Sequence, residues 1–207
     1  MKRHQINRFK KKKLISLVVD GECEFWYFAM MIRNETNLQI TLKPKLPQRK
    51  KLVDQFNEVK DSSNHFDKVF WIIDFDKLIE EDRAKPKGSK SPIQEFKEYQ
   101  ERLNKIENII ILINNPCLEF WFLLHFEKTG KFFNNCETAT KQLLKHLPDY
   151  DKSQKYYTKD DDIYKRLKEN QLNAISNAKA LKNFDIGDPN SAAAEMFNLF
   201  YGKNKLI

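Results

Sequence analysis

Three unbroken apolar runs, separated by segments with helical spacing, constrain the fold of this chain more than any other feature. The runs are KLISLVV at residues 13–19, KVFWIID at 68–74 and NIIILIN at 108–114. A strand that is buried on both faces has an unbroken apolar sequence, and strands that alternate with helices form a parallel sheet. We therefore expect an α/β fold in which a central, mostly parallel sheet is flanked by helices.

Weaker patterns fill in the connections and the last third of the chain. LQITL at 38–42 predicts a short strand, and the proline- and glycine-containing stretch 80–92 predicts a loop. Asn135 is a candidate helix cap, and the acids 160–162 favour a helix N-terminus. Helical spacing predicts helices from near residue 22 and over 49–63, 93–106, 117–127, 134–147, 160–184 and roughly 190–201. We expect two parts. Residues 1–130 would form a Rossmann-like α/β domain that carries a basic N-terminal arm, and residues 131–207 would form a helical C-terminal extension packed on it.

The balance of charge favours an acidic partner, although many basic proteins bind nothing acidic. The formal net charge of the 207 residues is +8, and a basic surface attracts nucleic acid first and anionic membranes second. Two lysine-rich segments, the arm of residues 1–13 and the 80–92 loop, are the candidates for phosphate contact, although such runs are more often solvated tails. The candidate nucleic-acid-binding residues are Lys10, Lys11, Lys12, Lys13, Lys85, Lys87 and Lys90.

The cysteines and the hydropathy indicate the cellular setting. Cys23, Cys117 and Cys136 are odd in number and lack CxxC spacing, so we expect neither a disulfide nor a zinc site, and a reducing cytoplasm fits. No apolar run reaches the roughly 20 residues that a membrane helix needs. LISLVV is short and no small-residue cleavage site follows it, so no signal peptide is expected. The sequence therefore predicts a cytoplasmic protein without a membrane anchor.

Carboxylates follow two of the apolar runs. Asp20 comes directly after the first run, with Glu24 close behind, and Asp74 and Asp76 end the second. Because the carboxyl ends of parallel strands meet at one edge of a sheet, we expect these four side chains to converge. Clustered carboxylates repel one another unless a cation neutralises them, and Mg²⁺ prefers oxygen ligands of this kind. The alternative is that these acids only cap helices.

A third acidic position lies in the apolar segment after the last of the three runs. Glu119 in NNPCLEFWFLLHFE, residues 114–127, needs a partner or a metal among its apolar neighbours. We favour a functional role, because the helix begins at the same edge of the sheet. His125 is interpreted as a packed, hydrogen-bonded core histidine. A Cys23 nucleophile has little support because no paired histidine is evident, and Walker A, GxGxxG and GxSxG motifs are absent from the sequence.

These motifs resemble those of known proteins. VDGECE at 19–24 resembles the V-E-G-x-x-D/E motif of the Toprim domain, and IIDFDK at 72–77 resembles its D-x-D. With the 114–127 stretch, the chain is similar to the RloB family, whose members carry E/D-G-x-T-E, D-x-D and N-P-C-x-E-x-W-x-L-L-H-F motifs. YKRLKENQLNAISNAKAL and DPNSAAAEMF also resemble that family's helical tail, so the resemblance covers nearly the whole chain.

The resemblance implies a Toprim-like fold and a role in bacterial phage defence by abortive infection. Genes of that family lie beside ABC-type or overcoming-lysogenization-type ATPases, and similar Toprim proteins are metal-dependent nucleases, some of which act on tRNA. Position by position, Asp20 matches the Toprim Glu, Glu24 the second acid, Asp74 and Asp76 the metal-binding pair, and Glu119 the acid of the third motif. The chain departs from the pattern at Asp20, one methylene shorter than Glu, and at Cys23, which replaces Thr.

The expected function is therefore that of a Mg²⁺- or Mn²⁺-dependent nuclease acting on DNA or RNA. The catalytic group would be Asp20, Glu24, Asp74, Asp76 and Glu119, of which Asp20, Asp74, Asp76 and Glu119 would ligate metal. One alternative is a non-catalytic nucleic-acid-binding or regulatory subunit that works through a partner ATPase, with Asp20 and Cys23 marking a degraded site. A nucleotidyl transferase or primase-like enzyme is a third hypothesis. The helical last third could form a homodimer or contact the ATPase.

Overall fold

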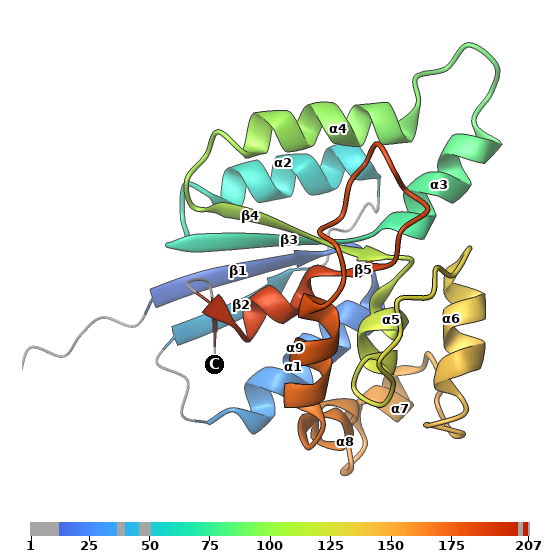
Figure 1. Ribbon diagram of the computed structural model, residues 1–207. Coiled ribbons are helices and arrows are strands. Elements are labelled where there is room, and N and C mark those ends of the chain that lie inside the picture. The colour runs from blue at the N-terminus through green and yellow to red at the C-terminus, as the bar shows by residue number, and fades with distance from the viewer. Residues whose placement is uncertain (1–12, 37–39, 46–50, 203–204, 207) are drawn as a thin grey trace, which may run out of the picture.

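The chain folds around a five-stranded sheet in which the carboxyl ends of the four parallel strands lie at one edge (Figure 1). The computed structural model describes residues 13–36, 40–45, 51–202 and 205–206. The strand order is β2-β1-β3-β4-β5, with four parallel strands and a short antiparallel β5. The strands are β1 (Lys13–Val19), β2 (Ile40–Lys45), β3 (Lys68–Asp74), β4 (Ile109–Asn115) and β5 (Ala193–Ala194). This confirms the predicted α/β class and each of the three apolar runs as a core strand.

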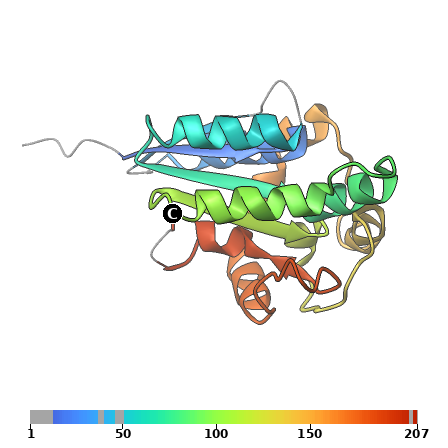
Figure 2. The same ribbon diagram turned by 90° about the horizontal axis from the view of Figure 1, so that it is seen from above.

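Helices cover both faces of the sheet. α2 and α4 lie side by side on one face, and α1, α5, α8, α9 and η1 lie on the other (Figures 1 and 2). The helices are α1 (Glu22–Asn34), α2 (Leu52–Ser62), α3 (Phe75–Ala84), α4 (Pro92–Leu103), α5 (Leu118–Leu123), α6 (Cys136–Leu143), α7 (Gln154–Thr158), α8 (Ile163–Lys168), α9 (Gln171–Lys179) and the 3₁₀ helix η1 (Glu195–Leu199). None of the helices in the described part of the chain has the length and apolar character needed to cross a bilayer.

The two covered faces explain why the strands have unbroken apolar sequences. Successive side chains of a strand point to opposite faces. In β3, Phe70 and Ile72 belong to the core beneath α1, whereas Trp71 and Ile73 belong to the core beneath α2 and α4. The indole nitrogen of Trp71 is buried there and donates to Gln55 Oε1 at 2.9 Å. Positions 69–73 of the strand are therefore all apolar, because neither face meets water there.

The last third of the chain packs against α1 and completes the sheet. Asn34 at the end of α1 donates through Nδ2 to Asp162 Oδ2 at 2.9 Å, and the Tyr164 hydroxyl donates to Glu35 Oε1 at 2.7 Å. Further on, β5 pairs with the end of β4, and Glu195 Oε2 accepts the backbone N–H of Ile113 at 2.9 Å. Asp162 and Asn135 cap α8 and α6, as their sequence positions predicted.

Several element boundaries differ from the sequence-based predictions. The predicted loop 80–92 begins only at residue 85, because buried Phe75 and Leu78 anchor α3 as far as Ala84. The segment 160–184 forms two helices instead of one, and α7 was not predicted. Residues 190–201 form β5 and η1 in place of a helix. Each of these segments is short, and its backbone conformation depends on contacts with distant parts of the chain.

Candidate functional site

Three carboxylates meet at the carboxyl ends of the neighbouring strands β1 and β3. Asp20 follows β1, Glu24 lies in the first turn of α1, and Asp74 is the last residue of β3. One carboxylate oxygen from each lies within 4.8 Å of the others. Asp20 Oδ2 also accepts the backbone N–H of Asp74 at 3.2 Å, which ties the two strand ends together. The predicted convergence of these three acids is confirmed in the geometry.

Gly21 allows the Glu24 carboxylate to fold back over the start of α1. A Cβ atom built at Gly21 would lie 2.3 Å from Glu24 Oε2, closer than any van der Waals contact permits. The Gly21 backbone, with φ −133° and ψ 164°, is an ordinary extended conformation. The glycine is therefore needed for the space that it leaves beside Glu24.

Burial and mutual repulsion make Glu24 and Asp74 hard to ionise. Burial raises the pKa of Glu24 to about 8, and the charges of Asp20 and Glu119 contribute to the increase. Burial also holds the pKa of Asp74 well above its usual value, helped by the charges of Glu24 and Asp20. Each acid favours the protonated form of its neighbour, so a nearby cation would stabilise the ionised cluster.

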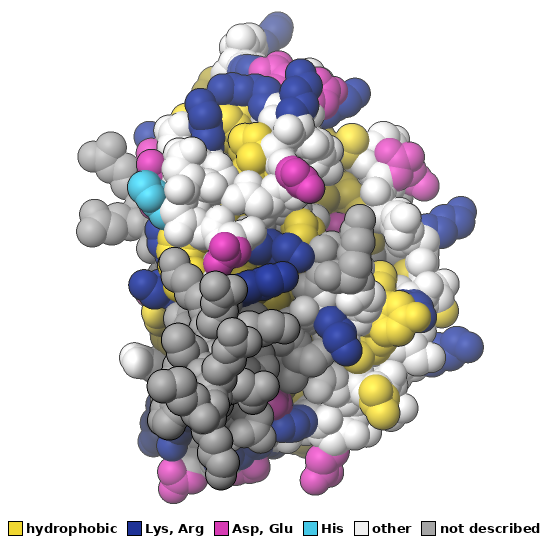
Figure 3. Space-filling model, turned by 90° about the vertical axis from the view of Figure 1, so that its left-hand side faces the viewer, with side chains coloured by type: hydrophobic (Ala, Val, Ile, Leu, Met, Phe, Trp, Pro, Cys, Tyr) yellow, Lys and Arg dark blue, Asp and Glu magenta, His cyan; other side chains and the backbone are white. Residues whose placement is uncertain are grey.

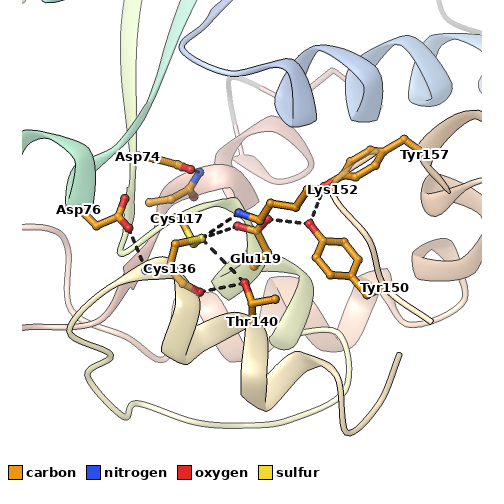
Figure 4. Close-up of polar contacts among 10 residues, drawn as sticks. Asp74, Asp76, Cys117, Glu119, Cys136, Thr140, Tyr150, Lys152 and Tyr157 are labelled. Carbon is orange, nitrogen blue, oxygen red and sulfur yellow. Dashed lines mark hydrogen bonds and ion pairs between the residues drawn. A yellow bond between two sulfur atoms is a disulfide. The ribbon is translucent and has the colours of Figure 1, made fainter. Parts of the chain in front are cut away.

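Glu119 lies across the same cavity and is held by groups from the last third of the chain. Its side chain is 2% exposed, and its Oε1 contacts Lys152 Nζ at 2.7 Å and accepts from the Tyr150 hydroxyl at 2.6 Å (Figure 4). Asp20, Glu24, Asp74, Glu119 and Lys152 all line this acid pocket, a cavity of about 280 Å³. Lys152 therefore brings a positive charge into the pocket that the sequence-based analysis did not identify.

Asp76 faces away from the three-acid cluster toward α6. Its Oδ2 accepts the backbone N–H of Cys136 at 2.8 Å, and its buried Oδ1 has no hydrogen-bond partner among the described residues. Burial raises the pKa of Asp76. Asp76 lines a second hollow of about 590 Å³ between α3 and α6, and Lys77 lines both cavities. The structure thus separates the two acids of the D-x-D motif, although they lie at adjoining cavities.

A disulfide joins Cys117 to Cys136, contrary to the sequence-based expectation. The two sulfur atoms are bonded at 2.09 Å, and Cys23 is the free cysteine of the chain (Figure 4). Cys136 Sγ lies 2.7 Å from Glu119 Oε2, a close contact but no hydrogen bond, because a disulfide sulfur carries no proton. The cysteines are 19 residues apart in sequence, and the fold brings the start of α5 beside the start of α6. No spacing pattern could have shown this pairing.

Of the lysines chosen from the sequence, none of the four that the structure describes lines the acid pocket. Lys10, Lys11 and Lys12 lie outside the described residues. Lys13 begins β1 at the amino edge of the sheet, the side shown in Figure 3, opposite Asp20. Lys85 and Lys90 pair with Asp82 and Glu98, whereas Lys87 is exposed on the loop. The cations at the pocket are instead Lys77, which directly follows the D-x-D motif, and Lys152, which lies in a polar stretch without a distinctive motif.

Two other candidate groups have structural explanations. His125 is 2% exposed, and its Nδ1 lies 3.0 Å from the Trp121 carbonyl oxygen, which confirms a core histidine. Burial lowers the pKa of His125 to about 4. For Cys23, burial and the nearby Glu24 charge raise the pKa of the thiol to about 12, so it stays protonated and is a poor nucleophile.

Comparison with known proteins gives one family match. The family described as RloB-like protein matches residues 15–199, most of the chain. The match includes all five acids discussed above and the segment that carries Lys152. No curated protein and no solved structure matches the chain.

Proposed function

The chain belongs to the RloB-like family, and from that premise we propose that it is a Toprim-type nuclease that depends on a divalent cation. The proposed reaction is hydrolysis of phosphodiester bonds in DNA or RNA, with tRNA as one candidate. The proposed setting is phage defence in the bacterial cytoplasm, with an ABC-type or overcoming-lysogenization-type ATPase as partner. Mg²⁺ is the proposed cofactor, and Mn²⁺ is the alternative.

The observation that carries the proposal is the cluster of Asp20, Glu24 and Asp74. Its donors are all carboxylate oxygens, which suit Mg²⁺ better than a thiophilic metal. Burial, together with the charges of neighbouring carboxylates, raises the pKa values of Glu24 and Asp74, so a bound cation would favour their ionised forms. The residues therefore fit a hard divalent cation. When bound, such ions would activate a water molecule and stabilise the leaving oxygen of a phosphodiester.

Side chains of the acid pocket would bind the cation and the substrate phosphate. Asp20, Glu24 and Asp74 would hold the cation on one wall of the acid pocket. Glu119, which lines the same pocket, would complete the ligand set, whereas Asp76 faces α6 and lies outside that set. Lys152 is half exposed at the acid pocket, so its ammonium group can contact a non-bridging phosphate oxygen of the substrate. This would place one cationic side chain opposite the three-acid cluster.

The proposal is tested with purified protein, Mg²⁺ or Mn²⁺, and three substrates: total tRNA, plasmid and single-stranded DNA. Asp74→Asn should lower cleavage by about 100-fold or more, since it removes a ligand from the cluster. It should not lower the melting temperature, because it also removes a buried, repelled carboxylate. Asp61→Asn, which changes an exposed acid at the end of α2, is the matched control and should keep full activity.

The outcomes separate this proposal from a binding or regulatory role. Equal cleavage by Asp74→Asn and the wild type would contradict the assignment of the site. The affinity for Mg²⁺ and Mn²⁺, measured by calorimetry, is a second readout. A wild-type protein that cleaves no substrate and binds neither Mg²⁺ nor Mn²⁺ would favour the non-catalytic subunit, with its site degraded at Asp20 and Cys23.

A further inference from the structure

The hollow between α3 and α6 adjoins the acid pocket. Lys77, which directly follows Asp76 on α3, lines both cavities, so they adjoin at this side chain. The hollow is the larger of the two, at about 590 Å³ compared with about 280 Å³. A cavity of roughly 300–1,000 Å³ is the size that holds a drug-sized ligand, which is also the size of a nucleotide.

The groups around the hollow fit a nucleotide. Arg83 is exposed and forms no ion pair with any described residue, so its guanidinium is available for a phosphate. Lys77 pairs with Glu80 at 3.2 Å, but both side chains are mostly exposed, and such pairs are weak and easily exchanged. Asn134 offers an exposed amide that can both donate to and accept from a base edge.

The buried Oδ1 of Asp76 is a second observation beside the hollow, because this oxygen has no hydrogen-bond partner among the described residues. Asp76 is 8% exposed. A buried acceptor without a partner is costly and is rarely retained without a reason. Asp76 lines the hollow and directly precedes Lys77, the residue that the hollow shares with the acid pocket. A ligand or cation at this junction would give that oxygen its partner.

We propose that the hollow between α3 and α6 binds the nucleotide that flanks the scissile phosphate, so that the substrate is an unpaired nucleic-acid strand. The strand leaves the acid pocket past Lys77 and enters the hollow, where Arg83 contacts the next phosphate. A nucleotide can occupy a cavity of this kind only when it is out of a base-paired stack. This inference rests on the proposed nuclease function and specifies its substrate.

The inference is tested by binding, independently of cleavage. The Asp74→Asn protein is titrated, without divalent cation, against fluorescently labelled single strands of about 12 nucleotides, RNA and DNA, and against a duplex of the same length. Arg83→Gln is introduced into the same background. Lys97→Gln is the matched control, because Lys97 is exposed on α4 and has no ion pair among the described residues.

The expected result has two parts. Single strands should bind more tightly than the duplex at equal salt. Arg83→Gln should weaken their binding about 10-fold, the usual effect of losing one charged hydrogen bond, and reduce the salt slope by about 0.7. The control should bind like the parent protein.

Equal binding by Arg83→Gln and Lys97→Gln, or tighter binding of the duplex, would overturn the inference. Failure of the nuclease proposal has a different signature. A wild-type protein that cleaves no substrate, while Arg83→Gln still weakens strand binding, would leave a single-strand-binding surface without catalysis. Circular dichroism melts of both variants establish that a change in binding is not a loss of folding.

Discussion

Lys152 Nζ lies 2.7 Å from Glu119 Oε1, so a loop of the last third of the chain supplies a cation to a carboxylate at the end of the sheet. The two side chains differ in environment, because Glu119 is 2% exposed and Lys152 is 49% exposed. The buried carboxylate therefore depends on a partner that can move into solvent. A cation bound at the acid pocket would compete with Lys152 for the same oxygen.

Replacing Lys152 with Met should make the protein without metal less stable and more responsive to metal. Glu119 would lose its charged partner, which should lower the free energy of unfolding by about 1–2 kcal/mol, a modest value because Lys152 is half exposed. Added Mg²⁺ should then raise the melting temperature more than it does in the wild type, since no ammonium competes with it. Differential scanning fluorimetry across a Mg²⁺ titration measures both effects.

Lys155→Met is the control for this variant, because Lys155 is an exposed lysine on the neighbouring α7 and has no ion pair among the described residues. It should melt like the wild type at every Mg²⁺ concentration. If the two variants behaved alike, Lys152 would have no coupling to the acid pocket.

Gly21→Ala should damage the three-acid cluster without unfolding the chain. The new methyl group would lie 2.3 Å from Glu24 Oε2, so the carboxylate must move, while the extended backbone at this position accepts alanine. We expect the affinity for Mg²⁺ to fall about 10-fold. Isothermal titration calorimetry measures that affinity. Gly130→Ala, whose methyl group would meet Leu181 Cδ2 at an ordinary 3.6 Å, should bind like the wild type. Unchanged binding in Gly21→Ala would show that Glu24 does not contribute to a metal site.

His125 should make the protein less stable in mild acid. Its pKa is about 4 in the folded chain and about 6.5 when unfolded, so the unfolded state binds the additional proton between those values. The stability that neutral His125 provides is complete above pH 6.5 and is lost as the pH falls toward 4, by up to about 3 kcal/mol.

The measurement is the free energy of unfolding from urea titrations between neutral pH and pH 4. His125→Asn, whose amide can still donate to the Trp121 carbonyl, should show a shallower loss of stability than the wild type. His65→Gln, at an exposed position, should retain the wild-type slope. Parallel curves for the wild type and His125→Asn would contradict the buried, neutral assignment.

Reduction of the Cys117–Cys136 disulfide should destabilise the protein by about 3 kcal/mol, the usual effect of opening a loop of this length. The comparison is urea unfolding with and without dithiothreitol. A Cys117→Ala/Cys136→Ala protein should be insensitive to the reductant, whereas Cys23→Ser should respond like the wild type because Cys23 is unpaired. Identical wild-type curves in both conditions would mean that the bond contributes nothing in solution.

The sequence predicted the parts of the site that follow from strand order. Asp20 and Asp74 end two apolar runs, and parallel packing alone brings such ends together. Glu119 followed from the same rule, applied to the helix after β4. These predictions needed only the hydrophobic pattern and the direction of the strands, which are strong local signals.

The parts of the site that the sequence could not predict depend on tertiary contacts. Lys152 lies in a polar loop whose position is set by α7 and α8 packing on α1, and nothing in its neighbouring residues indicates a pocket. The Cys117–Cys136 bond joins two helix starts that are adjacent only in the folded chain. The direction of Asp76, toward Cys136 rather than Asp74, is likewise set by where α6 lies.

The pairing of β5 with β4 is the last part of the sheet that can form during synthesis. A ribosome delivers the chain from its N-terminus, so β1, β3 and β4 are available before residues 193–195. Until then the end of β4, beside Asp74, is an unpaired edge, and the N–H of Ile113 lacks its Glu195 partner. Lys152 also arrives after all five acids. A nascent chain would therefore carry its five acids before Lys152, a lysine that lines the acid pocket, and any proposed activity that depends on Lys152 would appear only after that segment is made.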